Sequence, residues 1–365
     1  YEIFFYQINI FINTVKFKLS MEELKILILF VSTISFGMIL NKLATKYNLL
    51  LNYTGYPHQK FTKNKLVPLT GGILLLFLLL INFSINKYFY IFVILFFLLG
   101  ALGDYNLLKS AKIRFLLQLV LLLFTVNLFD LSILDIRIDF FDSLLQNKKV
   151  NIFFTVLCLM ILMNGSNFID GCNTLVIGYF IGVNIILFKL NLLHIILIDE
   201  IMIYYFFSML IAIFILNFFQ KLFLGDSGVY ILSLLLGVTL LGIYKSEPTI
   251  SPFFVCLLLW YPSFEVLFSI VRKLIFKTSV MNPDTLHFHQ LLYFFLNKKI
   301  KKINSIIINS LTSNIINAYN LSIFLIASNN VYYSKSLVWL LVFNIIVYCL
   351  FYVCLYKFRF SKVKI

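Results

Sequence analysis

Long runs of apolar residues alternate along this chain with short polar segments. The runs are about 20 residues long, which is the length of an α-helix that crosses the hydrocarbon core of a membrane. Helical periodicity within the runs is weak, as expected where lipid and neighbouring helices are both apolar. The strands of a β-barrel would instead alternate apolar and polar residues. The pattern therefore predicts an all-α, polytopic transmembrane helical bundle.

We expect ten or eleven transmembrane helices. Their approximate ranges are 24–40, 69–85, 88–103, 115–131, 150–163, 174–190, 201–217, 228–244, 251–270, 308–327 and 336–356. Residues 24–356 then form a single transmembrane domain, between an N-terminal extension (1–23) and a basic tail (357–365). Met21 is a candidate for the natural start, which would leave residues 1–20 upstream.

The charge pattern adds an orientation. The chain has a net charge of +15, but only 12% of its residues are charged, and the basic ones cluster in the loops of one face. That distribution favours contact with anionic membrane lipid and disfavours nucleic acid. Because loops rich in Lys and Arg stay in the cytoplasm, we predict that this face and the C-terminus are cytoplasmic and that the N-terminus is outside.

Acidic residues give a second pattern on the same face. Asp104, Asp170, Asp226 and Asp284 fall singly in four different loops of the predicted cytoplasmic face. Three histidines, His58, His287 and His289, share that face. Ionisable groups beside membrane helices are costly and usually functional. We therefore expect one shared polar site of carboxylates, imidazoles and lysines at this cytoplasmic face.

One of these loops is Asn164–Leu175, which reads N-G-S-N-F-I-D-G-C-N-T-L. It carries Asn164, Asn167, Asp170 and Asn173 at spacings of three. We interpret it as part of a site for a phosphate-bearing ligand and its metal. The alternative is a polar Asx-type turn between two helices.

The segment Leu224–Gly228, L-G-D-S-G, has a similar composition. Its glycines allow close approach of backbone to ligand, and a helix N-terminus here would favour anions. Asp226 suits Mg²⁺, which takes one or two carboxylates together with phosphates and waters. The alternative is an Asp or Ser N-cap of the next helix.

Two further segments complete the candidate site. Lys60 and Lys63, between Pro57 and Gly72, could hold phosphates as point charges, or could be plain positive-inside charge. His287 and His289 lack the further ligands of a zinc site, so phosphate contact or proton handling competes with a surface role. Glu265, within an apolar run, needs a partner, for which Arg272 is a candidate.

With these residues assembled, the chain resembles the polyprenyl-phosphate N-acetylhexosamine-1-phosphate transferases, bacterial membrane enzymes of glycosyltransferase family 4. The undecaprenyl-phosphate GlcNAc-1-phosphate transferases are the nearer type and the phospho-MurNAc-pentapeptide translocases the more distant. Five segments between about residues 40 and 295 resemble the family's motifs, in order. They are Pro57–Gly72, residues 100–118, Asn164–Leu175, Phe223–Gly228 and Pro283–Leu291.

The resemblance implies an activity and a set of roles. It implies transfer of N-acetylhexosamine-1-phosphate from a UDP-sugar to undecaprenyl phosphate in the bacterial inner membrane, releasing UMP and starting a cell-envelope glycan such as lipopolysaccharide. The resemblance does not decide the oligomeric state, for which a homodimer is the candidate. Mg²⁺, with Mn²⁺ as the alternative, would be bound by Asp226 and Asp170. The implied catalytic residues are Asp104, Asp170, Asp226, His287 and His289, and the implied substrate-binding residues are Lys60, Asn164, Asn167, Asn173, Phe223 and Asp284.

Three positions depart from the family pattern. Gly103 replaces the first aspartate of an Asp-Asp pair, Asn173 replaces an aspartate, and Gln290 replaces a histidine. The missing acid at 103 weakens the case for a carboxylate base, although a lipid phosphate is already largely ionised at pH 7. A membrane transporter or flippase, and a catalytically degenerate homologue, are the alternatives to the transferase.

Overall fold

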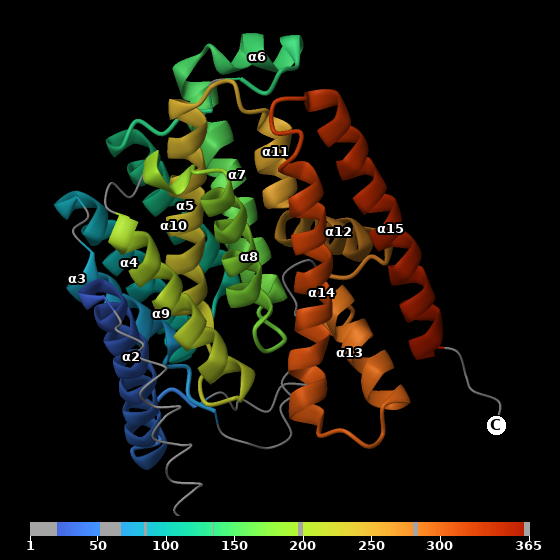
Figure 1. The fold of residues 1–365 in the computed structure, drawn as a ribbon. Helices are drawn as coiled ribbons and strands as arrows, with labels where there is room; N and C mark the ends of the chain where they lie inside the picture. The colour runs from blue at the N-terminus through green and yellow to red at the C-terminus, as the bar shows by residue number, and fades with distance from the viewer. Residues whose placement is uncertain are drawn as a thin grey trace, which may run out of the picture.

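The computed structural model describes residues 20–51, 67–83, 86–133, 135–195, 200–279 and 284–360, and this part of the chain is built from α-helices (Figure 1). Their bounds are α2 (Met21–Lys46), α3 (Gly71–Asn82), α4 (Lys87–Asp104), α5 (Ala111–Leu128), α6 (Asp139–Leu145), α7 (Lys148–Ile169), α8 (Leu175–Lys189), α9 (Glu200–Phe218), α10 (Gly225–Ser246), α11 (Pro252–Leu258), α12 (Trp260–Ile275), α13 (Phe288–Lys299), α14 (Ser305–Ala327) and α15 (Ser334–Phe360). A short 3₁₀ helix, Leu193–Ile195, precedes α9.

The predicted fold class, a polytopic helical bundle, is confirmed. Each of the eleven apolar ranges is largely helical in the structure. Among the described helices, seven are long and apolar enough to cross a membrane, and the number rises to eight if α11 and α12 count as one span. The other three expected spans correspond to α3 and α8, which are shorter than a bilayer requires, and to α14, which carries asparagine and serine along its length.

One expected span is broken. The range 251–270 forms α11 and α12, whose axes differ by 75°. The Ser251 side chain accepts a hydrogen bond from the Phe253 N–H, and Pro252 occupies the first turn of α11, where its missing donor costs nothing. In Figure 1, α12 lies across the bundle between α11 and α15.

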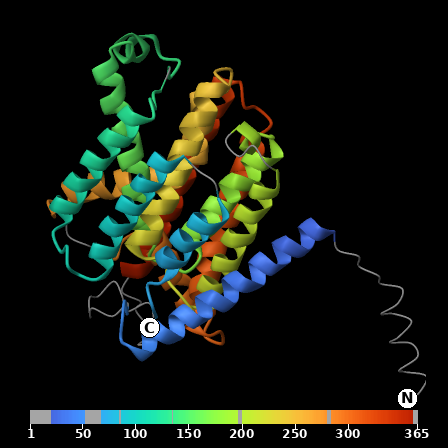
Figure 2. The same cartoon turned by 90° about the vertical axis from the view of Figure 1, so that its left-hand side faces the viewer.

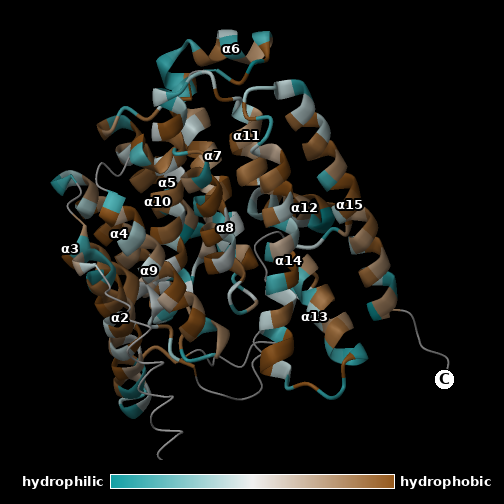
Figure 3. Ribbon diagram, in the orientation of Figure 1, coloured by the Kyte–Doolittle hydropathy of each residue, from teal (hydrophilic) through white to brown (hydrophobic). Residues whose placement is uncertain are grey.

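Helix α10 occupies the centre of the bundle. It packs against α3, α4 and α7, and most of its residues are buried. Figure 2 shows α2 running obliquely along one side of these helices. Hydrophobic ribbon covers most of the bundle in Figure 3, and hydrophilic colours gather at its two ends. The α9–α10 and α7–α8 loops lie toward the end that also carries α13, and α6 caps the opposite end (Figure 1).

Two glycines let α3 and α4 approach the beginning of α10 at backbone contact. A Cβ added at Gly100 would lie 2.6 Å from the carbonyl carbon of Asp226, and one added at Gly72 would lie 2.6 Å from the backbone nitrogen of Gly228. Real Cβ atoms do not approach backbone this closely, so only glycine fits at either position. The sequence around Asp226 is thus positioned by contacts that exclude side chains.

We expect Gly100→Ala to destabilise the protein by about 1–3 kcal/mol, because the added methyl group overlaps rigid backbone. The measurement is the apparent thermal unfolding midpoint in detergent. Gly182→Ala on α8 is the matched control, since its Cβ would meet only Leu321 and Phe324 side-chain atoms at 3.9 and 4.0 Å. Equal midpoints for the two variants would contradict the tight contact.

Candidate active site

The carboxylate of Asp104, at the end of α4, binds the first turn of α10. Its two oxygens accept hydrogen bonds from the backbone N–H of Asp226 (2.8 Å) and of Ser227 (3.1 Å), and from the Ser227 hydroxyl (2.7 Å). The first N–H groups of a helix lack partners within the helix and carry partial positive charge. Asp104 therefore fixes the position of Asp226.

Asp226 joins two further helices to this point. Its carboxylate accepts hydrogen bonds from the Arg114 guanidinium on α5 and from the Asn167 amide on α7, the latter at 2.7 Å. The predicted residues Asp104, Asn167 and Asp226 therefore come together. They bring α4, α5, α7 and α10 to one polar point within an apolar bundle.

Asp170 lies directly after α7 and beside this group. Among the described residues, its carboxylate has no hydrogen-bond or ion-pair partner. Burial raises the pKa of this carboxyl well above its usual value, and the negative charges of Asp226 and Asp104 raise it further. Asp170 is thus a carboxylate that lacks a compensating cation.

The three aspartates can be tested for the metal that the resemblance implies. No cluster of three or more His, Cys, Asp or Glu residues arranged to hold a metal ion occurs in the described ranges. Mg²⁺ does not need such a cluster, because it binds one or two carboxylates and completes its shell with phosphate and water. The buried carboxyl of Asp170, which has no side-chain partner among the described residues, lies beside Asp226 and fits that donor set.

Gly103 marks the place of the aspartate that this chain lacks. An ideal Cβ at Gly103 would lie 3.0 Å from Arg114 Nη1 and 3.0 Å from Asp226 Oδ2. A side chain here would therefore face the Arg114–Asp226 pair. Because residue 103 is glycine, Arg114 and Asp226 form their ion pair with no acidic side chain from position 103 beside it.

The histidine loop lies against the polar loop after α7. His287 packs its ring edge-on against Phe168, with 5.4 Å between centroids, and stacks on His289 at 5.7 Å. His289 is fully buried, and an added Cβ at Gly171 would collide with its Nε2 atom. Burial, and then the charge of His287, lowers the pKa of His289 to about 3, so this imidazole is neutral at pH 7.

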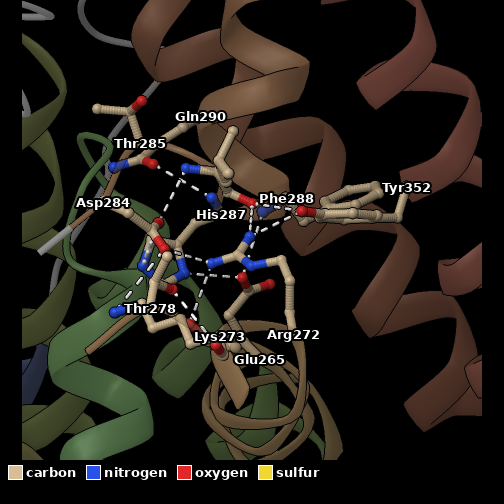
Figure 4. A network of polar contacts seen from close by, with 12 residues as sticks. Glu265, Arg272, Lys273, Thr278, Asp284, Thr285, His287, Phe288, Gln290 and Tyr352 are labelled. Carbon is tan, nitrogen blue, oxygen red and sulfur yellow. Dashed lines mark hydrogen bonds and ion pairs between the residues drawn. The ribbon is translucent and has the colours of Figure 1, made fainter. Parts of the chain in front are cut away.

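Asp284 is held by cations of α12. Its carboxylate lies 2.6 Å from Arg272 Nη2 and 3.7 Å from Lys273 Nζ (Figure 4). Burial raises the pKa of Asp284, but the Leu286 N–H and the charges of His287, Arg272 and Lys273 outweigh burial and bring it below its usual value. Asp284 is therefore an ionised residue that holds the histidine loop in place.

The remaining amides differ in position. Asn164 donates to Gln118 on α5 at 3.1 Å, close to the carboxylates. Asn173 is buried, and it donates from its backbone to Asn309 and from its side chain to Ser310 on α14. Its side-chain oxygen also accepts from Gln220. The hydrogen bonds of Asn173 are thus directed into the protein.

Phe223 lies beside the Pro-x-x-Gly-Gly segment. Its N–H donates to the Pro68 carbonyl at 2.9 Å, and its carbonyl accepts from the Gly71 N–H at 2.9 Å. The half-buried ring of Phe223 is therefore carried by a backbone pairing at the start of α3. Lys60, His58 and Lys63, which belong to the same expected segment, lie outside the described residues.

Comparison with known proteins addresses the family that these residues suggest. Residues 86–244 match the model of the family described as Glycosyl transferase family 4. That range contains Asp104, Asp170 and Asp226. The matched segment, residues 86–244, is similar to glycosyl transferase family 4. The match supports the family predicted from the sequence.

Two proteins that are similar to this chain carry informative names. The chain is 27% identical over 217 residues to a Bacillus subtilis protein named "Probable undecaprenyl-phosphate N-acetylglucosaminyl 1-phosphate transferase". It is 26% identical over 263 residues to the "Undecaprenyl-phosphate alpha-N-acetylglucosaminyl 1-phosphate transferase" of Thermotoga maritima. The matches cover 54% and 69% of this chain, and 55% and 75% of the relatives.

Sequence reasoning missed the partners of two residues near this site. Arg114 was expected to be one of many basic residues of its face, yet it forms the ion pair with Asp226. Glu265 was assigned Arg272 as its candidate partner, but it accepts hydrogen bonds from His287, Phe288 and Tyr348 instead. Arg114 lies just before an apolar run and Glu265 lies inside one, but neither position indicates the partner.

We expect Asp104→Asn to destabilise the protein by about 1–3 kcal/mol, because an amide offers one acceptor oxygen where the carboxylate offers two. The measurement is again the apparent unfolding midpoint in detergent. Asp130→Asn provides the control, since Asp130 is exposed and pairs with Lys245 at the opposite end of the bundle. An Asp104→Asn midpoint as high as that of the control would argue against the helix-capping role.

Proposed function

We propose that this protein transfers N-acetylhexosamine-1-phosphate from a UDP-sugar to undecaprenyl phosphate and releases UMP. The supporting observation is the convergence of Asp104, Asp226, Asn167 and Arg114, with Asp170 beside them, at one end of an apolar bundle that is similar to glycosyl transferase family 4. The relatives' names give the acceptor and the N-acetylglucosaminyl group. UDP-GlcNAc is therefore the first donor to test.

The reaction requires little covalent chemistry from the protein. Phosphoryl transfer depends mainly on positioning and on neutralising the charge of the transferring group. Because the lipid phosphate is largely ionised at pH 7, it can attack the donor without a carboxylate base. A glycine at position 103 is compatible with this mechanism.

The described residues fit three tasks in such a transfer. Arg114 supplies a fixed positive charge beside Asp226, close to where phosphates would bind. Asn164 and Asn167 supply amide groups on one face of α7. His287 and the neutral His289 supply ring nitrogens beside Asp170 and its loop. In this proposal the role of Lys60 remains that implied by the resemblance.

Asp170 and Asp226 are the residues that would hold Mg²⁺, with Mn²⁺ as the alternative. The bound ion would neutralise the negative charge of the diphosphate and its leaving group. Asp104 has its two oxygens occupied by the first turn of α10, so we give it the role of fixing Asp226.

An apolar cavity offers a place for the acceptor's isoprenoid chain. It has a volume of about 370 Å³ and lies between α7, α10, α11, α12 and α15. Its lining includes Leu159, Leu162, Val255, Trp260 and Phe264. A long hydrocarbon chain would gain about 25 cal/mol for each Å² buried from water, and the lipid setting would reduce that gain. This cavity would explain why the chemistry belongs in a membrane protein.

The same proposal places the enzyme in the inner membrane of a bacterium. Lys and Arg cluster on the face that carries the site, which supports a cytoplasmic site and C-terminus and an external N-terminus. The product would initiate a cell-envelope glycan such as lipopolysaccharide.

We expect the purified protein to release UMP from UDP-GlcNAc when undecaprenyl phosphate and Mg²⁺ are both present. Asp226→Asn should lower kcat by about 100-fold or more, because one charge that holds the ion and Arg114 is lost. Glu200→Gln, at the far end of α9, is the control. Absence of release with several UDP-N-acetylhexosamines would favour the degenerate homologue, and movement of an intact lipid-linked sugar across vesicles would favour the flippase.

We expect Cys256→Trp, which fills the apolar cavity, to raise KM for undecaprenyl phosphate about 10-fold and to leave KM for the UDP-sugar within about twofold. An acceptor with a much shorter isoprenoid chain should show a smaller change. Cys354→Trp is the matched control, because Cys354 is exposed on α15 and does not line the cavity. An unchanged KM for the long acceptor would place its chain elsewhere.

A further inference from the structure

Glu265 is a buried acid of α12 that the proposed reaction does not use. Its side chain is 1% exposed. Oε1 accepts hydrogen bonds from His287 Nδ1 at 3.0 Å and from the Phe288 N–H at 3.2 Å, and Oε2 accepts from the Tyr348 hydroxyl at 2.6 Å. Three donors around one carboxylate stabilise its ionised form.

This arrangement determines where His287 carries its proton. An ionised carboxylate can only accept hydrogen bonds, so the ring nitrogen that faces it, Nδ1, must be the donor. The other nitrogen, Nε2, lies 3.6 Å from Asp284 Oδ1. Nε2 is therefore the ring nitrogen left to gain or lose a proton, and it donates to a phosphate oxygen when it is protonated.

The orientation of the ring is also fixed. Phe168 contacts it edge-on, and His289 stacks against it with an interplanar angle of 8°. Phe168 belongs to the polar segment that carries Asn167 and Asp170. His287 thus lies between the buried carboxylate of Glu265 and the loop of the candidate active site.

The backbone that carries His287 is braced from α12 and α15. Arg272 donates to the Leu286 carbonyl and, at 2.7 Å, to the Tyr352 hydroxyl, which in turn donates to the same carbonyl at 2.9 Å. Arg359, near the end of α15, donates to the Thr285 carbonyl and, at 2.9 Å, to its hydroxyl. Figure 4 shows Arg272 at the centre of this network, with Tyr352 and Asp284 on opposite sides.

We propose that Glu265 is a positioning residue for His287: it holds the imidazole with a proton on Nδ1 and presents Nε2 to the substrate phosphate. The second half of this statement rests on the proposed function, because it takes His287 to contact a phosphate. The placement of the proton rests only on the contacts of Glu265. A carboxylate on the inner nitrogen of a functional histidine fixes both the tautomer and the orientation of the ring.

The test uses the full chain in detergent or lipid nanodiscs with ¹⁵N-labelled histidine. The chain has four histidines, so the His287 signals are assigned by their loss in His287→Gln. Long-range ¹H–¹⁵N spectra of the neutral ring distinguish the Nδ1–H from the Nε2–H tautomer. We expect the wild-type protein to show Nδ1–H and Glu265→Gln to show a large Nε2–H population, since a neutral amide can also donate to Nδ1.

Kinetics provide the second readout. Glu265→Gln should lower kcat for UMP release about 10- to 100-fold, as is usual when a residue that orients a functional histidine is lost, and should leave KM for the UDP-sugar within about twofold. Glu265→Asp, which retains the charge, should recover part of the loss. Glu247→Gln, an exposed Glu at the opposite end of the bundle, is the matched control.

Each outcome is decisive. An Nδ1–H tautomer retained in Glu265→Gln overturns the proposal, whether kcat falls or not. A tautomer change with unchanged kcat also overturns it, because the ring would then be held for no catalytic purpose. If Glu265→Gln changes the tautomer but the wild-type protein releases no UMP, the result supports the proton placement and contradicts the proposed function.

Discussion

The site depends on a single contact between a carboxylate and a helix N-terminus. Asp104 satisfies the first free N–H groups of α10 and thereby sets the direction of Asp226. These hydrogen bonds are partly buried, so loss of the carboxylate would leave N–H groups of the helix with few other partners. Gly100 allows the contact, because it brings α4 to within backbone distance of α10. Packing and polar chemistry therefore determine the same position.

A second layer of polar contacts brings the C-terminal third of the chain into the site. Glu265 and Arg272 on α12, with the tyrosines of α15, hold the loop that carries His287 and Asp284. The segment that matches the family model ends at residue 244, so this brace lies beyond it. The histidines of the last part of the chain contact the segment that carries Asp170 through Phe168 and Gly171.

The sequence predicted the positions of the membrane helices better than it predicted the hydrogen-bond partners of individual side chains. Apolar length alone located the eleven expected spans but not α6 or α13, which lie between them. The single acids at helix ends correctly indicated that Asp104 and Asp226 come together. The 75° break between α11 and α12 was missed, because a continuous apolar run does not show where its axis turns. The contacts of Glu265 and Asn173 were missed because hydrogen bonds between distant segments depend on tertiary packing. The match to the family adds to this picture but does not assign those partners.

The glycine at position 103, which departs from the family pattern, can be understood through the balance of charges around it. Asp104 is compensated by the N–H groups of α10, and Asp226 by Arg114 and Asn167. An acid at position 103 would face the same arginine and would add a charge that Arg114 alone could not balance. With glycine there, Asp170 is the carboxylate of this group that still lacks a counter-charge. One divalent cation shared between Asp170 and Asp226 would supply it, so the loss of an acid at 103 leaves the proposed requirement for a metal intact.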